Sequence, residues 1–354
     1  MNDSRSAVEA AAVGVPEAVA ALDGAGQGGT GRGGTGRPGT RRTALGPVAL
    51  VVAGGLSVQF GAAVAVLLMP KAGALGVVTL RLAAAALVLL AVCRPTLRGH
   101  SRADWGTVVA FGVAMCGMNT LFYQAADRIP LGAAVTLEVL GPLVLSVVAS
   151  RRLVNLVWAG LALVGVVLLS GMASPLFGRG RELGEGFDRL DPVGAAFALA
   201  AGAMWAAYIV FSARTGRRFP QADGLALAMG VAAALSLPLG IMESGSKLVV
   251  PSTLGLGAAV ALLSSVLPYT LELMALRRLP APTFAVLMSL EPAIAAMAGF
   301  LILDQALSTT DALAIALVVG ASVGAVRATA RRGTMEEGPK RVGRRPVRGK
   351  REGH

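Results

Sequence analysis

The sequence predicts an all-α membrane protein with ten transmembrane helices, arranged as two inverted five-helix repeats with both termini in the cytoplasm. Three observations predict this fold: charge is scarce, apolar runs recur, and one motif returns 150 residues later. Of the 354 residues, 55% are hydrophobic and only 15% are charged, whereas soluble domains carry about a quarter charged residues. Runs of about twenty apolar residues are long enough to cross roughly 30 Å of hydrocarbon.

The two ends of the chain have the composition of tails. Residues 1–46 contain "GAGQGGTGRGGTGRPGT", which has no apolar period and is expected to be disordered. This stretch lacks the Gly-Lys-Ser/Thr and the preceding strand of a phosphate-binding loop. Residues 328–354 are basic and are expected to form a disordered tail near anionic lipid headgroups. No aromatic residue interleaves these charges, so no nucleic-acid partner is expected.

Between the tails, short clusters rich in Arg, Pro and Gly separate the apolar runs and predict ten spans. The first repeat, residues 47–171, holds spans 47–69, 73–92, 104–126, 130–150 and 153–171. Residues 172–191 form an external connector loop, the only long gap between spans. The second repeat, residues 192–327, holds spans 192–212, 222–241, 253–276, 280–303 and 309–327.

The distribution of Lys and Arg predicts the orientation, because cytoplasmic loops carry an excess of these residues. With a cytoplasmic N-terminus, the internal loops hold ten: Arg94, Arg98, Arg102, Arg151, Arg152, Arg214, Arg217, Arg218, Arg277 and Arg278. The external loops hold six: Lys71, Arg128, Arg179, Arg181, Arg189 and Lys247. Both basic tails then fall on the internal side as well.

A repeated motif relates the two halves. "AADRIPLGAAVTLEVLGP" (125–142) aligns with "ALRRLPAPTFAVLMSLEP" (275–292), with Ala, Arg and two Pro residues identical at an offset of 150. Because each half has an odd number of spans, the second must enter the membrane from the opposite side, an architecture typical of transporters. Pro142 and Pro292 are expected to break their helices and free backbone carbonyls near mid-membrane.

Ionisable residues inside the spans are the candidate functional groups. A charged side chain at mid-bilayer costs about 2.5–3.5 kcal/mol, so such groups are expected to face a cavity, a partner or a proton path. Glu138 and Glu291 lie deep in their spans, Arg81 lies near the middle of span two, and Glu272 falls toward a membrane interface. Glu138, Glu291 and Glu272 are the candidates for proton coupling.

An arginine and several glutamates in one helical bundle suit a zwitterionic substrate. Arg81 is expected to pair with a carboxylate through a two-pronged bond, and Glu138 or Glu291 to pair with an ammonium. The alternative is a structural Arg–Glu pair that only locks helices together. Polar and aromatic side chains supply the rest of the candidate substrate site, although each could equally form hydrogen bonds between helices. They are Gln59, Asn119, Tyr123, Trp205, Tyr208 and Tyr269.

Residue types that hydrolytic enzymes need are scarce. The two histidines, His100 and His354, cannot form a histidine metal site, and the two cysteines do not suggest a disulfide framework. We therefore expect neither a metal nor a cofactor, and no enzymatic activity. An integral membrane enzyme stays a distant alternative, because the one long loop offers acids without His or Cys.

Several segments resemble the EamA-type transporters of the drug/metabolite transporter superfamily, and within it the bacterial threonine/homoserine exporter subgroup. The resemblance covers essentially all of 47–327. It is carried by "GALGVVTLRL" (73–82), "GMNTLFYQAADRIPLGAAVTLEVLGPLVLSVVASRR" (117–152), "AGAMWAAYIV" (201–210) and "SSVLPYTLELMALRRLPAPTFAVLMSLEPAIAA" (264–296). It implies a ten-span inner-membrane exporter of small amino acids, working by alternating access, with its cavity between the repeats. Export of another small solute stays open, as does a homodimer.

One departure from the resemblance concerns residues 304–305. Related proteins usually carry a Gly-Glu pair after span nine, where this chain reads Asp304-Gln305. If that glutamate serves coupling in the relatives, Asp304 must replace it here or the coupling must differ.

Overall fold

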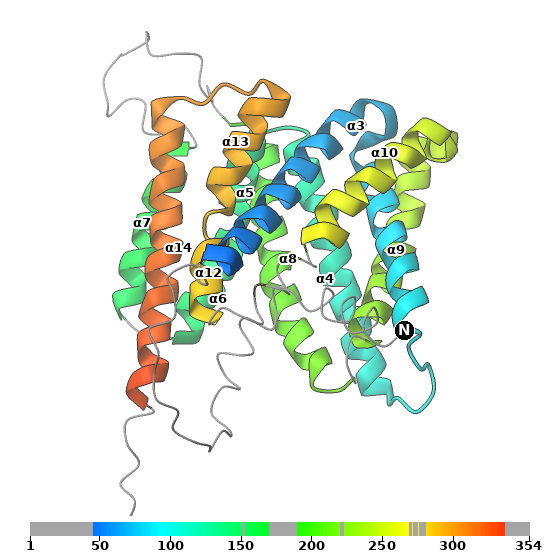
Figure 1. The fold of residues 1–354 in the computed structure, drawn as a ribbon, viewed down its shortest axis with the longest axis horizontal. Coiled ribbons are helices and arrows are strands. Elements are labelled where there is room, and N and C mark those ends of the chain that lie inside the picture. Colours follow the sequence, from blue (N-terminus) through cyan, green and yellow to red (C-terminus); the bar gives the residue numbers. More distant parts are fainter. Residues whose placement is uncertain are drawn as a thin grey trace, which may run out of the picture.

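A computed structural model describes residues 45–150, 153–169, 190–219, 223–268, 271, 275 and 281–336. Within these residues every regular element is a helix, which confirms the predicted all-α class. Figure 1 shows the helices packed side by side as a bundle. The predicted tail 1–46, apart from its last two residues, and nearly all of the connector 172–191 lie outside the described residues.

The first long helix, α3 (Leu45–Cys93), contains two of the predicted spans. Pro70 lies within it, and Gly73 has a backbone conformation with φ 65° and ψ 165° that is not helical. A positive φ is a conformation that glycine adopts at little cost. The chain therefore reverses at this point into a first leg, residues 45–72, and a second leg, residues 74–93.

The remaining helices follow the predicted ranges, with some differences at their ends. They are α4 (Arg102–Ala126), α5 (Leu131–Glu138), α6 (Leu140–Ser150), α7 (Leu153–Leu169), α8 (Pro192–Gly216), α9 (Asp223–Ser244), η2 (Gly245–Val249), α10 (Pro251–Ala261), η3 (Leu262–Val266), α12 (Ala281–Met288), α13 (Glu291–Leu303) and α14 (Thr309–Glu336). The last helix continues to Glu336, past the predicted end of its span at residue 327. Alanine, arginine and methionine in this stretch favour helix.

Both proline-containing motifs form broken helices. The segments α5 and α12 have eight residues each, and each begins and ends 150 residues from the other. In the first motif, α5 ends before Val139 and α6 begins at Leu140. In the second motif, α12 ends before Ser289 and α13 begins at Glu291. Pro142 and Pro292 therefore lie in the first turn of α6 and α13, where a missing N–H costs little. The breaks precede the prolines by a few residues.

Within the part of the chain that the structure describes, five helical stretches are long and apolar enough to cross a membrane: Gly46–Cys93, Arg102–Ala126, Pro192–Gly216, Asp223–Val249 and Val286–Leu303. The first has 48 residues and its two legs cover two predicted spans. Shorter apolar helices lie at Leu131–Leu145, Val157–Val166, Pro251–Ser265 and Thr309–Gly324. The break at Val139 divides the predicted span 130–150 into two shorter helices, α5 and α6.

Helix packing pairs elements from the two halves of the chain. The second leg of α3 packs on α9, α5 packs on α13, and α7 packs on α14, and Figure 1 shows α7 and α14 together at one edge. In each of these pairs the two elements come from predicted spans that are five apart in chain order. Two further pairs are equivalent to one another: α4 packs on α8 (spans three and six), and α10 with η3 packs on α3 (spans eight and one). Such an exchange of partners is what a two-fold axis between the halves would produce.

Glycines permit the closest of these contacts. A Cβ added at Gly141 would collide with the backbone carbonyl of Gly202, and one at Gly202 would collide with the carbonyl oxygen of Glu138. The junction between α5 and α6 therefore lies directly against α8. Because backbone atoms form both sides of this contact, a side chain here could not be accommodated by a change of rotamer.

Replacing Gly141 by alanine is expected to destabilise the protein by about 1–3 kcal/mol, the usual effect of overpacking. The matched control is Gly160→Ala, since a Cβ at Gly160 meets nothing within 4 Å and alanine favours helix. Thermal unfolding of the purified proteins in detergent measures the difference. Equal melting temperatures for the two variants would contradict the close contact.

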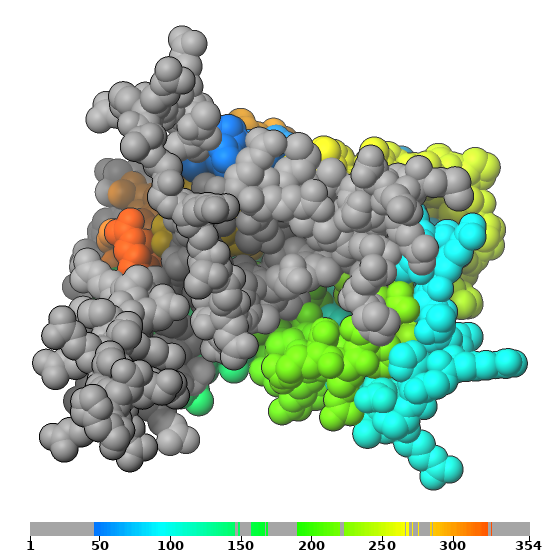
Figure 2. Space-filling view, turned by 60° about the horizontal axis from the view of Figure 1, so that its bottom comes forward, coloured from blue at the N-terminus to red at the C-terminus, as the bar shows by residue number. Residues whose placement is uncertain are grey.

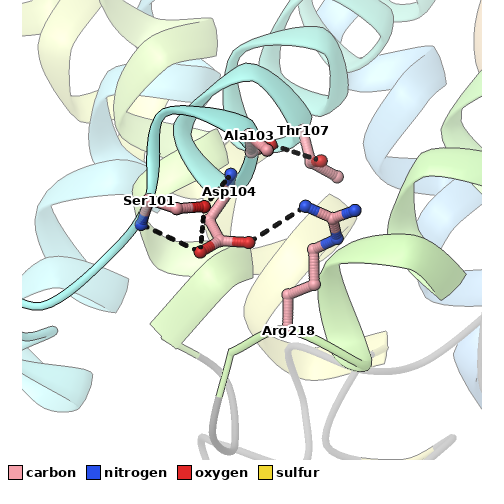
Figure 3. A network of polar contacts seen from close by, with 5 residues as sticks. All are labelled: Ser101, Ala103, Asp104, Thr107 and Arg218. Carbon is pink, nitrogen blue, oxygen red and sulfur yellow. Dashed lines mark hydrogen bonds and ion pairs between the residues drawn. The ribbon is translucent and has the colours of Figure 1, made fainter.

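One group of polar contacts lies at the predicted cytoplasmic face (Figure 3). The Asp104 carboxylate accepts hydrogen bonds from the Ser101 backbone N–H at 3.0 Å and from the Ser101 hydroxyl at 2.7 Å, and pairs with Arg218 at 3.0 Å. The His100 ring packs on Phe219, with centroids 4.4 Å apart. Figure 2 shows the surfaces of the α4 start and the α8 end adjoining here. Exposed ion pairs contribute about 0–1 kcal/mol, so this network is a local cap.

Candidate functional site

Arg81 is the centre of the candidate site. It lies on the second leg of α3 and is half-buried. Its Nη1 donates to the Tyr123 hydroxyl at 3.1 Å, and its Nη2 donates to the Ser264 backbone carbonyl at 3.3 Å. The guanidinium carbon also lies 5.8 Å from the centre of the Tyr123 ring, within the range of a cation–π contact. Three helical elements therefore converge on one guanidinium.

The carbonyl that Arg81 uses belongs to an irregular helical turn. Ser264 lies in η3, a π-helical segment, and such segments are rare and frequent at functional sites. The first leg of α3 approaches closely, because the Ser57 hydroxyl donates to the Leu263 carbonyl at 2.7 Å. A Cβ at Gly61 would collide with the Ser264 hydroxyl. Sequence reasoning missed Ser264, since a backbone acceptor has no residue-type signature.

Glu138 and Glu291 meet because α5 and α13 are antiparallel. A Cβ at Gly132 would overlap Ala296, and one at Gly299 would lie 3.7 Å from Leu131, so residues later in α5 lie beside residues earlier in α13. Continuing toward the end of α5 brings Glu138 next to the start of α13, where Glu291 lies. In Figure 1, α5 and α13 lie above α6 and α12.

The two glutamates and Arg81 form one electrostatic cluster. The Glu138 carboxylate is close enough to interact with both Glu291 and Arg81. Glu138 is half-buried, whereas Glu291 is only 8% exposed and occupies the first turn of α13, where a helix favours negative charge. With all three groups ionised, the cluster carries one carboxylate more than Arg81 can balance.

Two further predicted residues lie on elements that contribute to this cluster. Asn119 is buried one turn before Tyr123 on α4, and its amide nitrogen donates to the Met115 carbonyl at 2.9 Å. Gln59 is 3% exposed on the first leg of α3, and its Oε1 has no hydrogen-bond partner among the described residues. An unpaired buried carbonyl is costly, so a ligand or water at Gln59 would satisfy it.

The aromatic residue Tyr208 of α8 lies away from the cluster of Arg81, Glu138 and Glu291. Tyr208 packs against Phe111 with ring centroids 5.1 Å apart, and Phe111 precedes Tyr123 on α4 by about 18 Å. Trp205 is half-buried one turn before Tyr208. The structure therefore places the Tyr208 ring beside the middle of α4, about three turns before Tyr123. Tyr269 and Glu272 lie outside the described residues.

The unusual Asp304-Gln305 pair has a structural explanation. Asp304 is exposed and ends α13 in the left-handed conformation, with φ 50° and ψ 30°, where glycine is the usual residue. Gln305 then reaches across to α5, and its Oε1 accepts a hydrogen bond from the Leu131 N–H at 3.0 Å. The polar side chain that reaches another helix is thus Gln305, and a coupling role for Asp304 stays a prediction.

Comparison with known proteins finds similarity to transporters. The model of the EamA-like transporter family matches residues 192–327. The threonine/homoserine exporter RhtA of Escherichia coli (strain K12) is 39% identical over 278 residues, which are 78% of this chain and 90% of that protein. The RhtA of Salmonella typhimurium (strain LT2) matches equally well. A solved crystal structure of a protein aligns with 80% of this chain and 98% of its own, at 21% identity and a TM-score of 0.46.

Proposed function

This chain belongs to the EamA-like transporter family, and we propose that it exports small amino acids of the threonine and homoserine type across the inner membrane. It is a multi-pass transporter rather than an enzyme. The relatives named threonine/homoserine exporters suggest the substrate class. Alternating access between the two repeats is the proposed mechanism.

The charge balance of the central cluster is the observation that carries this proposal. An amino acid placed between Arg81 and Glu138 would give its carboxylate to the guanidinium and its ammonium to the glutamate. The ammonium would also balance the second carboxylate, from Glu291. In the absence of substrate, a proton bound to Glu138 or to Glu291 would neutralise that second carboxylate instead. Substrate and proton would then replace one another in the cluster, which is the basis of proton-coupled export.

The proposed membrane topology has ten spans, an inverted second repeat and both termini in the cytoplasm. Contacts between loops support it. Asp104, at the predicted cytoplasmic end of its span, contacts Arg218 in a predicted cytoplasmic loop, and Arg128 lies 3.9 Å from Asp191 across two predicted external loops. The exchange of helix partners described above supports the two-fold relation between repeats.

Transport in proteoliposomes tests the function. Purified protein is expected to move radiolabelled threonine or homoserine across the vesicle membrane, and an imposed pH gradient is expected to accelerate net movement. Protein-free vesicles are the control, and a panel of unlabelled amino acids and other metabolites ranks the substrates by competition. A pH gradient without effect would exclude proton coupling. Transport of an unrelated solute in preference to every amino acid would show that this chain is a metabolite exporter of another kind.

A further inference from the structure

We infer that Glu243 and Gln305 are positioning residues: they cap, from the second repeat, the two helical segments that carry Arg81 and Glu138. This inference rests on the proposed function, because it assigns Arg81 and Glu138 to the substrate. Both caps lie at the predicted external ends of their helices. Neither residue touches the central cluster itself in the described contacts.

The first cap holds the second leg of α3. The Glu243 carboxylate, at the end of α9, accepts hydrogen bonds from the backbone N–H groups of Leu75 at 2.7 Å and Gly76 at 3.1 Å. These N–H groups belong to the first turn of the leg and have no partner within their own helix. A side chain at Gly73 would collide with this carboxylate, so glycine there permits both the reversal and the cap. Next to Glu243, the Ser244 hydroxyl donates to the Ala72 carbonyl.

The second cap holds α5. Pro130 precedes this helix and provides no side-chain cap. The acceptor comes instead from Gln305, whose Oε1 bonds the Leu131 N–H at 3.0 Å. The same oxygen lies against Gly299, so the amide is held between α13 and α5. A glutamine at this position therefore replaces a cap that the local sequence lacks.

Each cap is close to a charged residue of the cluster. Arg81 lies six residues after Leu75, about 9 Å along the leg, and Glu138 lies seven residues after Leu131, about 10 Å along α5. A helical segment transmits an axial shift or a frayed first turn over such a distance. A misplacement of about 1 Å in reacting groups can lower the rate of a catalysed reaction about a hundredfold. By the same need for precise placement, the caps are expected to set how well Arg81 and Glu138 fit the substrate.

The test compares variants that remove the hydrogen-bond acceptor with variants that keep it. Glu243→Ala and Gln305→Met remove it, whereas Glu243→Gln and Gln305→Glu keep it. The first two are expected to raise the transport KM about fivefold or more, with a smaller change in Vmax per folded transporter. The second two are expected to stay within about twofold of the unaltered protein. Met242→Ala and Leu307→Ala, at neighbouring exposed positions, are the matched controls.

Hydrogen–deuterium exchange measures the order of the two capped helical segments and does not depend on the transported solute. Residues 75–82 and 131–138 are expected to exchange faster in Glu243→Ala and Gln305→Met respectively, and unchanged in the acceptor-keeping variants. Unchanged KM and unchanged exchange in the variants without an acceptor would overturn the inference. So would conservative variants as impaired as the others. If the unaltered protein moves no solute, the proposed function fails, while the exchange data still decide whether the caps order these segments.

Discussion

Arg81→Ala is expected to lower the affinity for substrate by about a hundredfold or more. A hydrogen bond to a charged group contributes about 1.5–3 kcal/mol, and a two-pronged pair with a carboxylate has two of them. At about 1.4 kcal/mol for each factor of ten, losing both corresponds to at least two orders of magnitude. Competition by unlabelled threonine or homoserine in proteoliposomes measures this affinity.

Arg81→Lys and Arg98→Ala are the companion variants. Lysine keeps the charge but not the planar fork that matches a carboxylate, so an intermediate affinity is expected. Arg98 is an exposed residue of the loop before α4, and its loss is expected to leave transport within about twofold of normal, as for surface changes in general. Normal substrate affinity in Arg81→Ala, with the protein folded, would mean that Arg81 only joins helices.

Glu138→Gln is expected to separate substrate exchange from proton-driven export. Glutamine cannot take up and release a proton, so the pH gradient should no longer drive net movement of the amino acid. Its neutral amide leaves one carboxylate of the cluster, Glu291, to balance the charge of Arg81, and an incoming ammonium loses a partner. Gradient-driven transport is therefore expected to fall at least about tenfold, the effect of losing one charge-assisted bond of about 1.4 kcal/mol or more.

Counterflow experiments complete this prediction. Exchange of labelled for unlabelled substrate needs no net proton movement, and it is expected to survive in Glu138→Gln better than gradient-driven transport does. Asp127→Asn, an exposed carboxylate in the loop between α4 and α5, controls for the loss of a negative charge elsewhere. If both assays fell equally in Glu138→Gln, the glutamate would serve substrate binding alone.

The sequence predicted the candidate site unevenly. Arg81, Glu138 and Glu291 were recognisable because an ionisable residue in an apolar span is costly without a purpose, and the structure places them together. Tyr123 was found from its position one turn after Asn119. Tyr208 carried the same kind of signal, yet its ring packs on Phe111, about three turns before Tyr123 on α4. Residue type and helical spacing identify a polar face, whereas the neighbour of that face depends on packing.

By itself the sequence determined the helical class, the apolar spans and the motif that recurs after 150 residues, because these depend on composition and on local periodicity. Only the tertiary structure decided which groups meet. Arg81 finds Tyr123 at a separation of 42 residues and the Ser264 carbonyl at a separation of 183. Glu243 and Gln305 gave no signal as caps, since their partners are backbone N–H groups about 170 residues away. Contacts of this kind are set by helix packing, which local sequence does not encode.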